Sequence, residues 1–161
     1  MWRGLEGALP EPRWPEGITL RTYERGDGVA VKTLLDEAYT AWDDAYTARA
    51  QEDWERWMTA HDEFDPALWF LVERDGELVA CALHWKEHEG RGWLKDLAVR
   101  ESERGRGLAQ ALLHHAFRTY AGRGAKCVGL KVESRNPTGA LQLYESVGFV
   151  VDPTFDPAAE P

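Results

Sequence analysis

Two glycines alternating with two arginines form the segment of this sequence whose residue types point most directly to chemistry. Residues 104–109 read Arg-Gly-Arg-Gly-Leu-Ala, between an apolar run that ends at Val99 and a helix-forming stretch that starts near Leu108. Glycine lets a ligand approach the backbone without Cβ clashes. The helix that follows directs free N–H groups and its positive dipole end back toward the same loop. The segment therefore predicts an anion site, with a pyrophosphate as its natural occupant.

Two familiar phosphate-binding motifs do not fit this loop. A P-loop ends in Gly-Lys followed by Ser or Thr, and no such tripeptide follows here. The dinucleotide fingerprint requires Gly or Ala three residues after Gly107, where Gln110 stands instead. Taken alone, the segment leaves one structural alternative, a surface loop whose glycines only allow a tight turn.

A second group of polar residues lies in the last predicted helix and just before it. Asn136 precedes Pro137, an arrangement typical of a helix N-cap followed by a first-turn proline. Tyr144 lies within the same predicted helix, where its ring could pack in the core with its hydroxyl bonded. From the residue types alone, capping and packing are sufficient reasons for both residues.

Apolar periodicity gives the elements that must position these residues. Helical spacing predicts helices over 31–42, 49–60, 108–120 and 137–147. Alternating or continuous apolar runs predict strands over 18–23, 68–73, 78–85, 93–99 and 128–132, and a short strand from 149. The second and third of these strands are joined by Asp75-Gly76, a hairpin turn dipeptide. This order predicts a mixed α/β architecture.

Composition narrows the class of protein. The chain has 161 residues, with 43% hydrophobic and 29% charged residues, which indicates one globular domain. We expect an extended N-terminal arm over 1–15, where Pro10, Pro12 and Pro15 oppose helix, a main folded domain over 16–152 and a tail over 153–161. Cys81 and Cys127 fall in apolar runs without metal-ligand spacing, so buried reduced thiols and no metal are expected.

Charge and hydropathy exclude several partners. A net charge of -9 argues against nucleic acid; it would attract a cationic amine, although ordinary surface charge explains it more simply. No apolar run approaches the roughly 20 residues that cross a bilayer, and residues 1–15 do not resemble a secretory signal. We therefore expect no membrane association and a cytoplasmic location.

Two segments together resemble a known family. The pattern of residues 104–109, preceded by the strand Asp96–Val99, resembles the cofactor-binding motif of the GNAT superfamily of N-acetyltransferases. Residues 136–149, Asn-Pro-Thr-Gly-Ala-Leu-Gln-Leu-Tyr-Glu-Ser-Val-Gly-Phe, resemble the second signature of that superfamily. The resemblance covers about residues 68–151. It implies the GNAT fold, an α/β fold whose central mixed, mostly antiparallel sheet has a splayed cofactor-binding pair of strands and helices on both faces.

The resemblance also implies roles for individual residues. Tyr144 would be the general acid that protonates the leaving thiolate, and Asn136 would contact the pantetheine arm or lie beside the thioester. The backbone of the strand end would pair with the pantetheine arm, and the loop amides would hold the pyrophosphate. These cofactor-binding residues are Leu97, Ala98, Val99, Arg104, Gly105, Arg106, Gly107, Leu108 and Ala109.

The implied function is acetyl-CoA-dependent N-acetyl transfer to a primary amine of a small molecule or peptide, with a homodimer as a possible assembly. A non-catalytic acyl-CoA sensor or interaction module of the same fold is the alternative. Residues 64–69 and 133–140 are similar to the mycothiol synthase branch of the superfamily. Members of that branch usually carry two tandem GNAT domains, whereas this chain has room for one, so a different amine acceptor is expected.

The residue that accepts the proton of the amine is left open. Many family members place a Glu or His on the cofactor strand, but the face shared by residues 93, 95, 97 and 99 carries Trp93 and Lys95. Strand alternation predicts that Asp96 points to the other sheet face. The alternatives on the preceding strand are His84, Glu87 and His88. The acceptor pocket is expected to be shaped by Trp93, Lys95, Tyr39, Trp42, Tyr46, Trp54 and Trp57, although core packing is the simpler interpretation for the last two.

Overall fold

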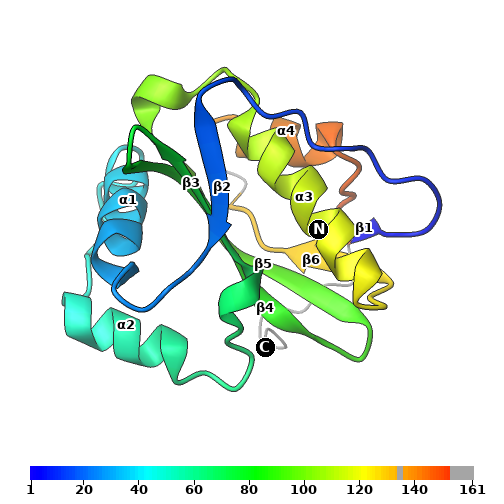
Figure 1. Cartoon of the computed structure of the whole chain (residues 1–161), viewed down its shortest axis with the longest axis horizontal. Coiled ribbons are helices and arrows are strands. Elements are labelled where there is room, and N and C mark those ends of the chain that lie inside the picture. Colours follow the sequence, from blue (N-terminus) through cyan, green and yellow to red (C-terminus); the bar gives the residue numbers. More distant parts are fainter. Residues whose placement is uncertain (134–135, 153–161) are drawn as a thin grey trace.

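A computed structural model of the chain describes residues 1–133 and 136–152. Its centre is a six-stranded sheet in the order β1-β6-β5-β4-β3-β2 (Figure 1). Every neighbouring pair is antiparallel except β5 and β6, which are parallel. The strands are β1 (Trp2–Gly4), β2 (Ile18–Thr22), β3 (Trp69–Arg74), β4 (Glu77–His88), β5 (Arg91–Val99) and β6 (Cys127–Leu130). The predicted mixed, mostly antiparallel sheet is confirmed.

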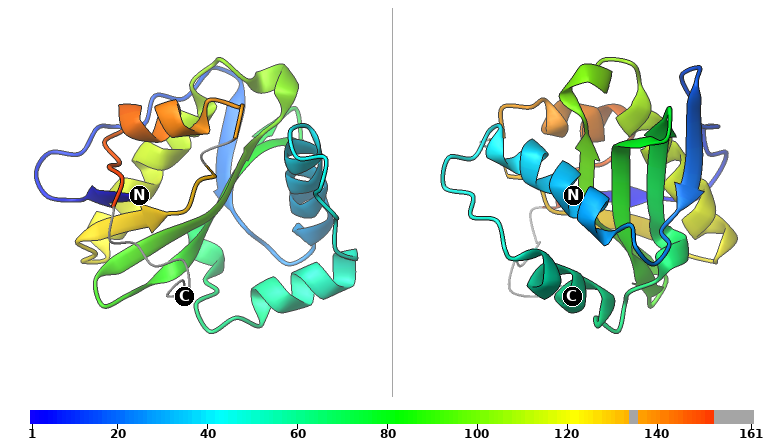
Figure 2. Two further views of the ribbon diagram at one scale, coloured as in Figure 1. Left: turned by 180° about the vertical axis from the view of Figure 1, so that it is seen from behind. Right: turned by 60° about the vertical axis from the view of Figure 1, so that its left-hand side comes forward.

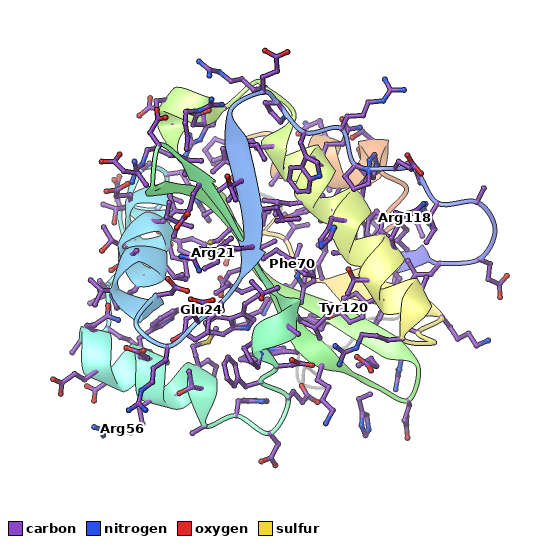
Figure 3. The ribbon with its side chains drawn as sticks, in the orientation of Figure 1. Arg21, Glu24, Arg56, Phe70, Arg118 and Tyr120 are labelled. Atoms are coloured by element: carbon purple, nitrogen blue, oxygen red, sulfur yellow. The ribbon has the colours of Figure 1, made fainter. Side chains whose placement is uncertain are left out.

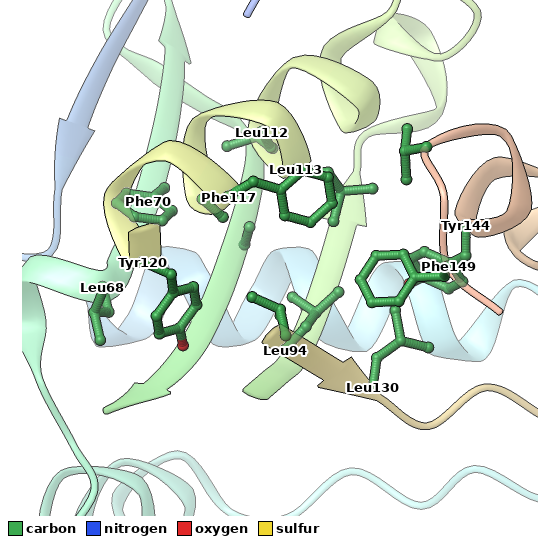
Figure 4. Close-up of a cluster of buried hydrophobic side chains, with 14 of the residues drawn as sticks. Leu68, Phe70, Leu94, Leu112, Leu113, Phe117, Tyr120, Leu130, Tyr144 and Phe149 are labelled. Carbon is green, nitrogen blue, oxygen red and sulfur yellow. The ribbon is translucent and has the colours of Figure 1, made fainter. Parts of the chain in front are cut away.

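Helices cover both faces of this sheet, as Figures 1 and 2 show. The helices α1 (Gly28–Thr40) and α2 (Gln51–Thr59) lie on one face, and α3 (Leu108–Gly122) and α4 (Ala140–Ser146) lie on the other. The face under α1 buries an apolar cluster that includes Leu34, Trp69 and Trp93. The face under α3 buries a second cluster around Phe117 (Figure 4). Two separate apolar layers therefore sandwich the sheet.

The α3 layer is built from large side chains that the sheet and the helix share. Phe70 of β3 and Tyr120 of α3 are fully buried between the two elements, whereas Arg56 of α2 extends outward (Figure 3). The hydroxyl of Tyr120 donates to the carbonyl of Trp85 on β4 and accepts from the N–H of Trp93 on β5 at 3.3 Å. Tyr120 thus fixes the α3 helix to the two central strands.

The first residues of the chain supply an edge strand that the sequence interpretation placed in an extended arm. Trp2–Gly4 pairs with β6, and the N–H of Trp2 donates to the carbonyl of Val150 at 2.9 Å. A Cβ on Gly129 of β6 would lie 2.5 Å from the Trp2 ring, so glycine lets that ring pack flat on the strand. Residues 2–4 therefore belong to the sheet. The division at residue 16 stays a prediction, and the predicted tail over 153–161 lies outside the described residues.

The two parallel strands, β5 and β6, separate partway along their length. Pairing between β5 and β6 runs from Arg91 to Leu94 on β5 and ends where Leu94 faces Leu130. On its other side β5 stays paired with β4 as far as Val99. The edge of residues 95–99 that faces β6 therefore has no strand partner within residues 1–133 and 136–152. This is the splayed pair of strands that the sequence predicts.

Candidate active site

A cavity of about 450 Å³ lies where β5 and β6 separate. Its walls come from α1 and the turn after it on one face of the sheet, from both splayed strands, and from α4 on the other face. The cavity therefore reaches through the sheet from one face to the other. Of the site residues predicted from the sequence, it brings together Leu97, Ala98, Val99, Arg104, Ala109, Asn136 and Tyr144.

The glycine loop lies next to this cavity, although Gly105, Arg106, Gly107 and Leu108 do not line it. Gly105 and Gly107 have φ of +77° and +82°, and a Cβ on either would meet nothing within 4 Å. Leu108 is buried in the core and anchors the first turn of α3. Among the described residues, the N–H groups of 105–110 find no hydrogen-bond acceptor. The loop thus presents an exposed row of unpaired donors at the positive end of a helix.

A buried ion pair between Arg74 and Glu103 holds the loop at residues 104–109 in place. Glu103 is 6% exposed and accepts from Arg74 of β3, with Nε–Oε1 at 2.8 Å and Nη2–Oε2 at 3.2 Å. Arg106 donates to the same carboxylate at 3.4 Å, and Arg104 Nε donates to the carbonyl of Val99 at 3.1 Å. The loop is therefore tied to both β3 and β5. Sequence reasoning missed Glu103 and Arg74, because no motif signals a pair separated this far along the chain.

A β-bulge at Lys95 overturns the predicted orientation of Asp96. Asp96 faces Leu83 across the β4–β5 pair and Leu94 faces the next residue, His84, so no β4 residue faces Lys95. The extra residue shifts the alternation of side chains by one position. Asp96 therefore points to the α1 face together with Trp93 and lines the cavity, instead of pointing away from it. Asp96, which strand alternation placed on the other face, therefore lies in the site.

Asp96 lies between two tyrosines of different elements. The hydroxyl of Tyr39 on α1 donates to Asp96 Oδ1. Burial and the negative charge of Asp96 raise the pKa of Tyr39 well above its ordinary value, and the same two causes, burial first, raise the pKa of Tyr144. Tyr144 on α4 is 8% exposed, packs against Phe149 at 5.7 Å between ring centroids (Figure 4) and lines the cavity. One cavity thus holds a carboxylate that can accept a proton and a phenol that keeps its own.

Asn136 lines the cavity from a turn rather than from the start of a helix. Its Oδ1 accepts from the backbone N–H of Thr138 at 2.9 Å and from the hydroxyl of the same residue. The helix α4 begins only at Ala140, with Gly139 at φ +78° as its N-cap. The predicted N-cap role of Asn136 is therefore wrong, because a left-handed residue separates it from the helix.

The other proposed bases lie away from the cavity. His84 is fully buried under α3, and burial lowers its pKa to about 3. Glu87 lies 2.9 Å from Nε of Arg123, and the side chain of His88 is exposed. Cys81 is also buried, with its thiol pKa raised by burial, so it does not offer a thiolate. Asp96 is the carboxylate of β5 that the cavity can use.

The predicted aromatic residues divide into two groups. Tyr39, Trp42 and Tyr46 line the cavity, and so does the predicted pocket residue Lys95. Trp54 packs on Trp69 of the core, Trp57 is exposed on α2, and Trp93 packs against Trp2. The last three residues lie outside the cavity. The last turn of α1 and the segment after it therefore supply the aromatic part of the site.

Comparison with known proteins agrees with this geometry. Residues 29–149 match the family model described as acetyltransferase (GNAT) family. The chain belongs to the GNAT acetyltransferases, a family of enzymes that transfer acetyl groups from acetyl-CoA. This membership confirms the predicted family, whose members are acyltransferases.

The individual relatives are longer proteins. Mycothiol acetyltransferase of Streptomyces coelicolor is 37% identical over 91% of this chain and 47% of its own length. The enzyme of the same name from Thermobispora bispora is 38% identical over 92% of this chain and 52% of its own length. The crystal structure of a GCN5-related N-acetyltransferase from Sphaerobacter thermophilus is 36% identical with a TM-score of 0.76, over 91% of this chain and 45% of that one. The chain thus spans about half the length of these relatives. Within the described residues, no helix has the length and apolarity to cross a bilayer.

Proposed function

We propose that this chain binds acetyl-CoA in the cavity between β5 and β6 and transfers the acetyl group to a primary amine of a small molecule or peptide. The observation that carries this proposal is a cavity that crosses the sheet where β5 and β6 separate, with unpaired amide donors beside one end and Asp96 and Tyr144 in its wall. When bound, acetyl-CoA supplies an activated thioester carbonyl.

The residues of the chain divide the work of the transfer. The amides of the loop at 104–109 hold the pyrophosphate, and the free edge of Leu97–Val99 pairs with the pantetheine arm. Asp96 takes the proton that the ammonium form of the acceptor must lose before its nitrogen attacks the carbonyl. Tyr144 gives a proton to the departing thiolate sulfur, and such acid assistance is typically worth about 10²- to 10⁴-fold in rate. The C–N bond forms, the C–S bond breaks and free CoA leaves.

The surroundings of Asp96 and Tyr144 suit these opposite roles. Tyr144 is protonated at neutral pH, because burial and the nearby Asp96 charge disfavour its phenolate. The carboxylate of Asp96 lines the cavity, and the hydroxyl of Tyr39 orients one of its oxygens. The predicted lack of a metal, cytoplasmic location and homodimer stay predictions beside this proposal.

A pair of matched variants tests the proposal. Gly107→Val places a side chain beside the loop amides. Gly124→Val introduces the same change at φ +86° in the exposed turn just after α3, where a Cβ also meets nothing within 4 Å. Both substitutions carry a backbone strain of roughly 1–2 kcal/mol. By calorimetry, Gly124→Val should bind CoA as the wild type does, and Gly107→Val should lose binding.

The same preparations then separate enzyme from sensor. Release of CoA from acetyl-CoA, followed with a thiol reagent across a panel of amines, should require the wild-type loop. CoA binding without transfer to any amine would favour a non-catalytic acyl-CoA module. Lack of CoA binding by the wild type would reject the proposed function.

A further inference from the structure

The end of the cavity on the α1 face is walled by aromatic rings. The rings of Tyr39 and Tyr46 stack with their centroids 5.4 Å apart and an interplanar angle of 30°. The Trp42 ring lies 6.4 Å from that of Tyr39 at 57°. All three residues line the cavity. The chain between the last turn of α1 and residue 46 thus folds its three aromatic residues into one group.

The hydroxyls of the two tyrosines in this group already donate hydrogen bonds within the protein. Tyr39 donates to Asp96, and Tyr46 donates to Asp36 Oδ1 at 2.7 Å. What these residues offer a ligand is therefore their ring surface. The π-face of an aromatic ring carries negative potential and attracts cations, and a phenol that donates to a carboxylate is polarised in the same direction.

Charged residues of the cavity reinforce this preference at the same end. Asp43 and Asp96 line it, with the exposed Lys95 as the cationic lining residue from β5. Asp43 Oδ1 accepts from the N–H of Ala45 at 3.0 Å, which fixes the carboxylate in the turn after α1. The remaining charged lining residues, Arg104, Lys131 and Glu133, come from the loop before α3 and the segment after β6.

The two carboxylates and the aromatic rings can bind more than one positive charge of a ligand. In the proposed function, Asp96 receives the proton of the reacting amine, and one of its oxygens already accepts from Tyr39. A single ammonium group beside Asp96 would leave Asp43 and the ring group without a ligand counterpart. The two carboxylates lie on different elements, β5 and the turn after α1, so they can serve two groups of one molecule.

We propose that the acceptor is a small dicationic amine, such as a diamine. This inference rests on the proposed function. One amine of the acceptor lies beside Asp96 and is acetylated. The second cationic group keeps its charge and lies against the rings of Tyr39, Trp42 and Tyr46 next to Asp43.

Three amines of equal chain length test the inference: 1,5-diaminopentane, 1-aminopentane and 5-aminopentanoate. They present the same reacting amine with a cationic, apolar or anionic far end. With the wild type, kcat/KM for the diamine should exceed that for 1-aminopentane about tenfold or more, because the aromatic faces attract its second positive charge. It should exceed that for 5-aminopentanoate by a larger factor.

Two variants test whether Trp42 and Asp43 cause the preference for the diamine. Trp42→Leu and Asp43→Asn should each lower the diamine to 1-aminopentane ratio of kcat/KM, by up to about tenfold, while the affinity for CoA stays at the wild-type value. Trp57→Leu, which removes an exposed tryptophan of α2 outside the cavity, should leave the ratio unchanged.

The outcomes separate this inference from the function on which it rests. Equal kcat/KM for the three amines, an unaltered ratio in both Trp42→Leu and Asp43→Asn, or CoA binding without acetylation of the diamine would each overturn the dicationic acceptor. Acetylation of 1-aminopentane in the first two cases would leave the proposed acetyl transfer standing. Absence of CoA binding would remove both.

Discussion

The phenol of Tyr39 on α1 donates its hydrogen bond to the carboxylate of Asp96 on β5, at the bulge where β5 leaves β6. This bond orients the acidic residue that faces the acceptor side of the cavity. We predict that Asp96→Asn lowers kcat about 10²-fold, because an amide cannot take the proton of the incoming ammonium group. Steady-state kinetics at saturating acetyl-CoA measures this change.

Tyr39→Phe is the companion variant, because it removes the orienting bond and leaves the carboxylate in place. Its kcat should fall less than that of Asp96→Asn, and both variants should keep the wild-type affinity for CoA. A full wild-type kcat in Asp96→Asn would exclude Asp96 as the proton acceptor.

Tyr144 supplies a second kinetic prediction. Tyr144→Phe should lower kcat by at least about 10²-fold while CoA affinity changes little, because the phenol acts on the departing sulfur and not on the bound nucleotide. Burial raises the pKa of Tyr144, and the pKa of an unperturbed tyrosine is about 10. The wild-type rate should therefore show no alkaline decline from this residue below that pH. An unchanged kcat in the variant would leave Tyr144 as a packing residue beside Phe149.

Much of the fold follows from local patterns in the sequence. The predicted helix over 108–120 is observed as α3 (Leu108–Gly122), and the predicted strand over 93–99 lies within β5. The α3 helix has strong apolar periodicity, and it begins after Gly107 and ends at Gly122. The loop at 104–109 could also be predicted from its residue types. Gly105 and Gly107 have positive φ in the structure, and glycine is the residue that adopts this conformation most readily.

The orientation of Asp96 could not be predicted in this way. Strand alternation assigns faces correctly only while the register is regular, and a bulge depends on pairing with β4 that the residues of β5 do not encode locally. The edge strand at Trp2–Gly4 is a similar case. Its partner β6 is far away in sequence, and three residues give too short a pattern to distinguish a strand from an extended arm.

The buried ion pair beneath the loop predicts a coupling between stability and cofactor binding. Glu103→Gln leaves the partly buried Arg74 without its counter-charge, so the free energy of unfolding should fall by about 1–3 kcal/mol. The loop loses its tie to β3 at the same time, so CoA affinity should also fall. Urea unfolding and calorimetry measure the two effects.

The exposed pair Arg100–Glu77, with atoms 3.4 Å apart, provides the control. Glu77→Gln should change the free energy of unfolding by no more than about 1 kcal/mol, with CoA affinity unchanged. If Glu103→Gln behaved like Glu77→Gln in both measurements, the ion pair between Arg74 and Glu103 would have no role in the conformation of the loop.

His84 predicts a specific response to acid. Its folded pKa of about 3 lies below the ordinary 6.5, so on acidification the unfolded chain takes up the proton first. The contribution of neutral His84 to stability is therefore complete above about pH 6.5 and declines as the pH falls toward 3. Between pH 7 and 5 this amounts to about 2 kcal/mol.

His84→Leu removes that titration while keeping an apolar side chain under α3. Urea unfolding at pH 7 and pH 5 should show a smaller loss of stability in the variant than in the wild type, by about 2 kcal/mol. Equal losses in the two proteins would mean that His84 is protonated within the folded core.

Amide hydrogen exchange with and without CoA tests the central claim most directly, because the claim concerns backbone donors. The N–H groups of residues 105–110 have no acceptor among the described residues and lie on an exposed loop and helix end. We predict rapid exchange in the free protein and strong protection of this segment when CoA is bound, with little change at the exposed end of α3 near Gly124. Saturating CoA that leaves residues 105–110 as unprotected as before would contradict the assignment of this loop to the pyrophosphate.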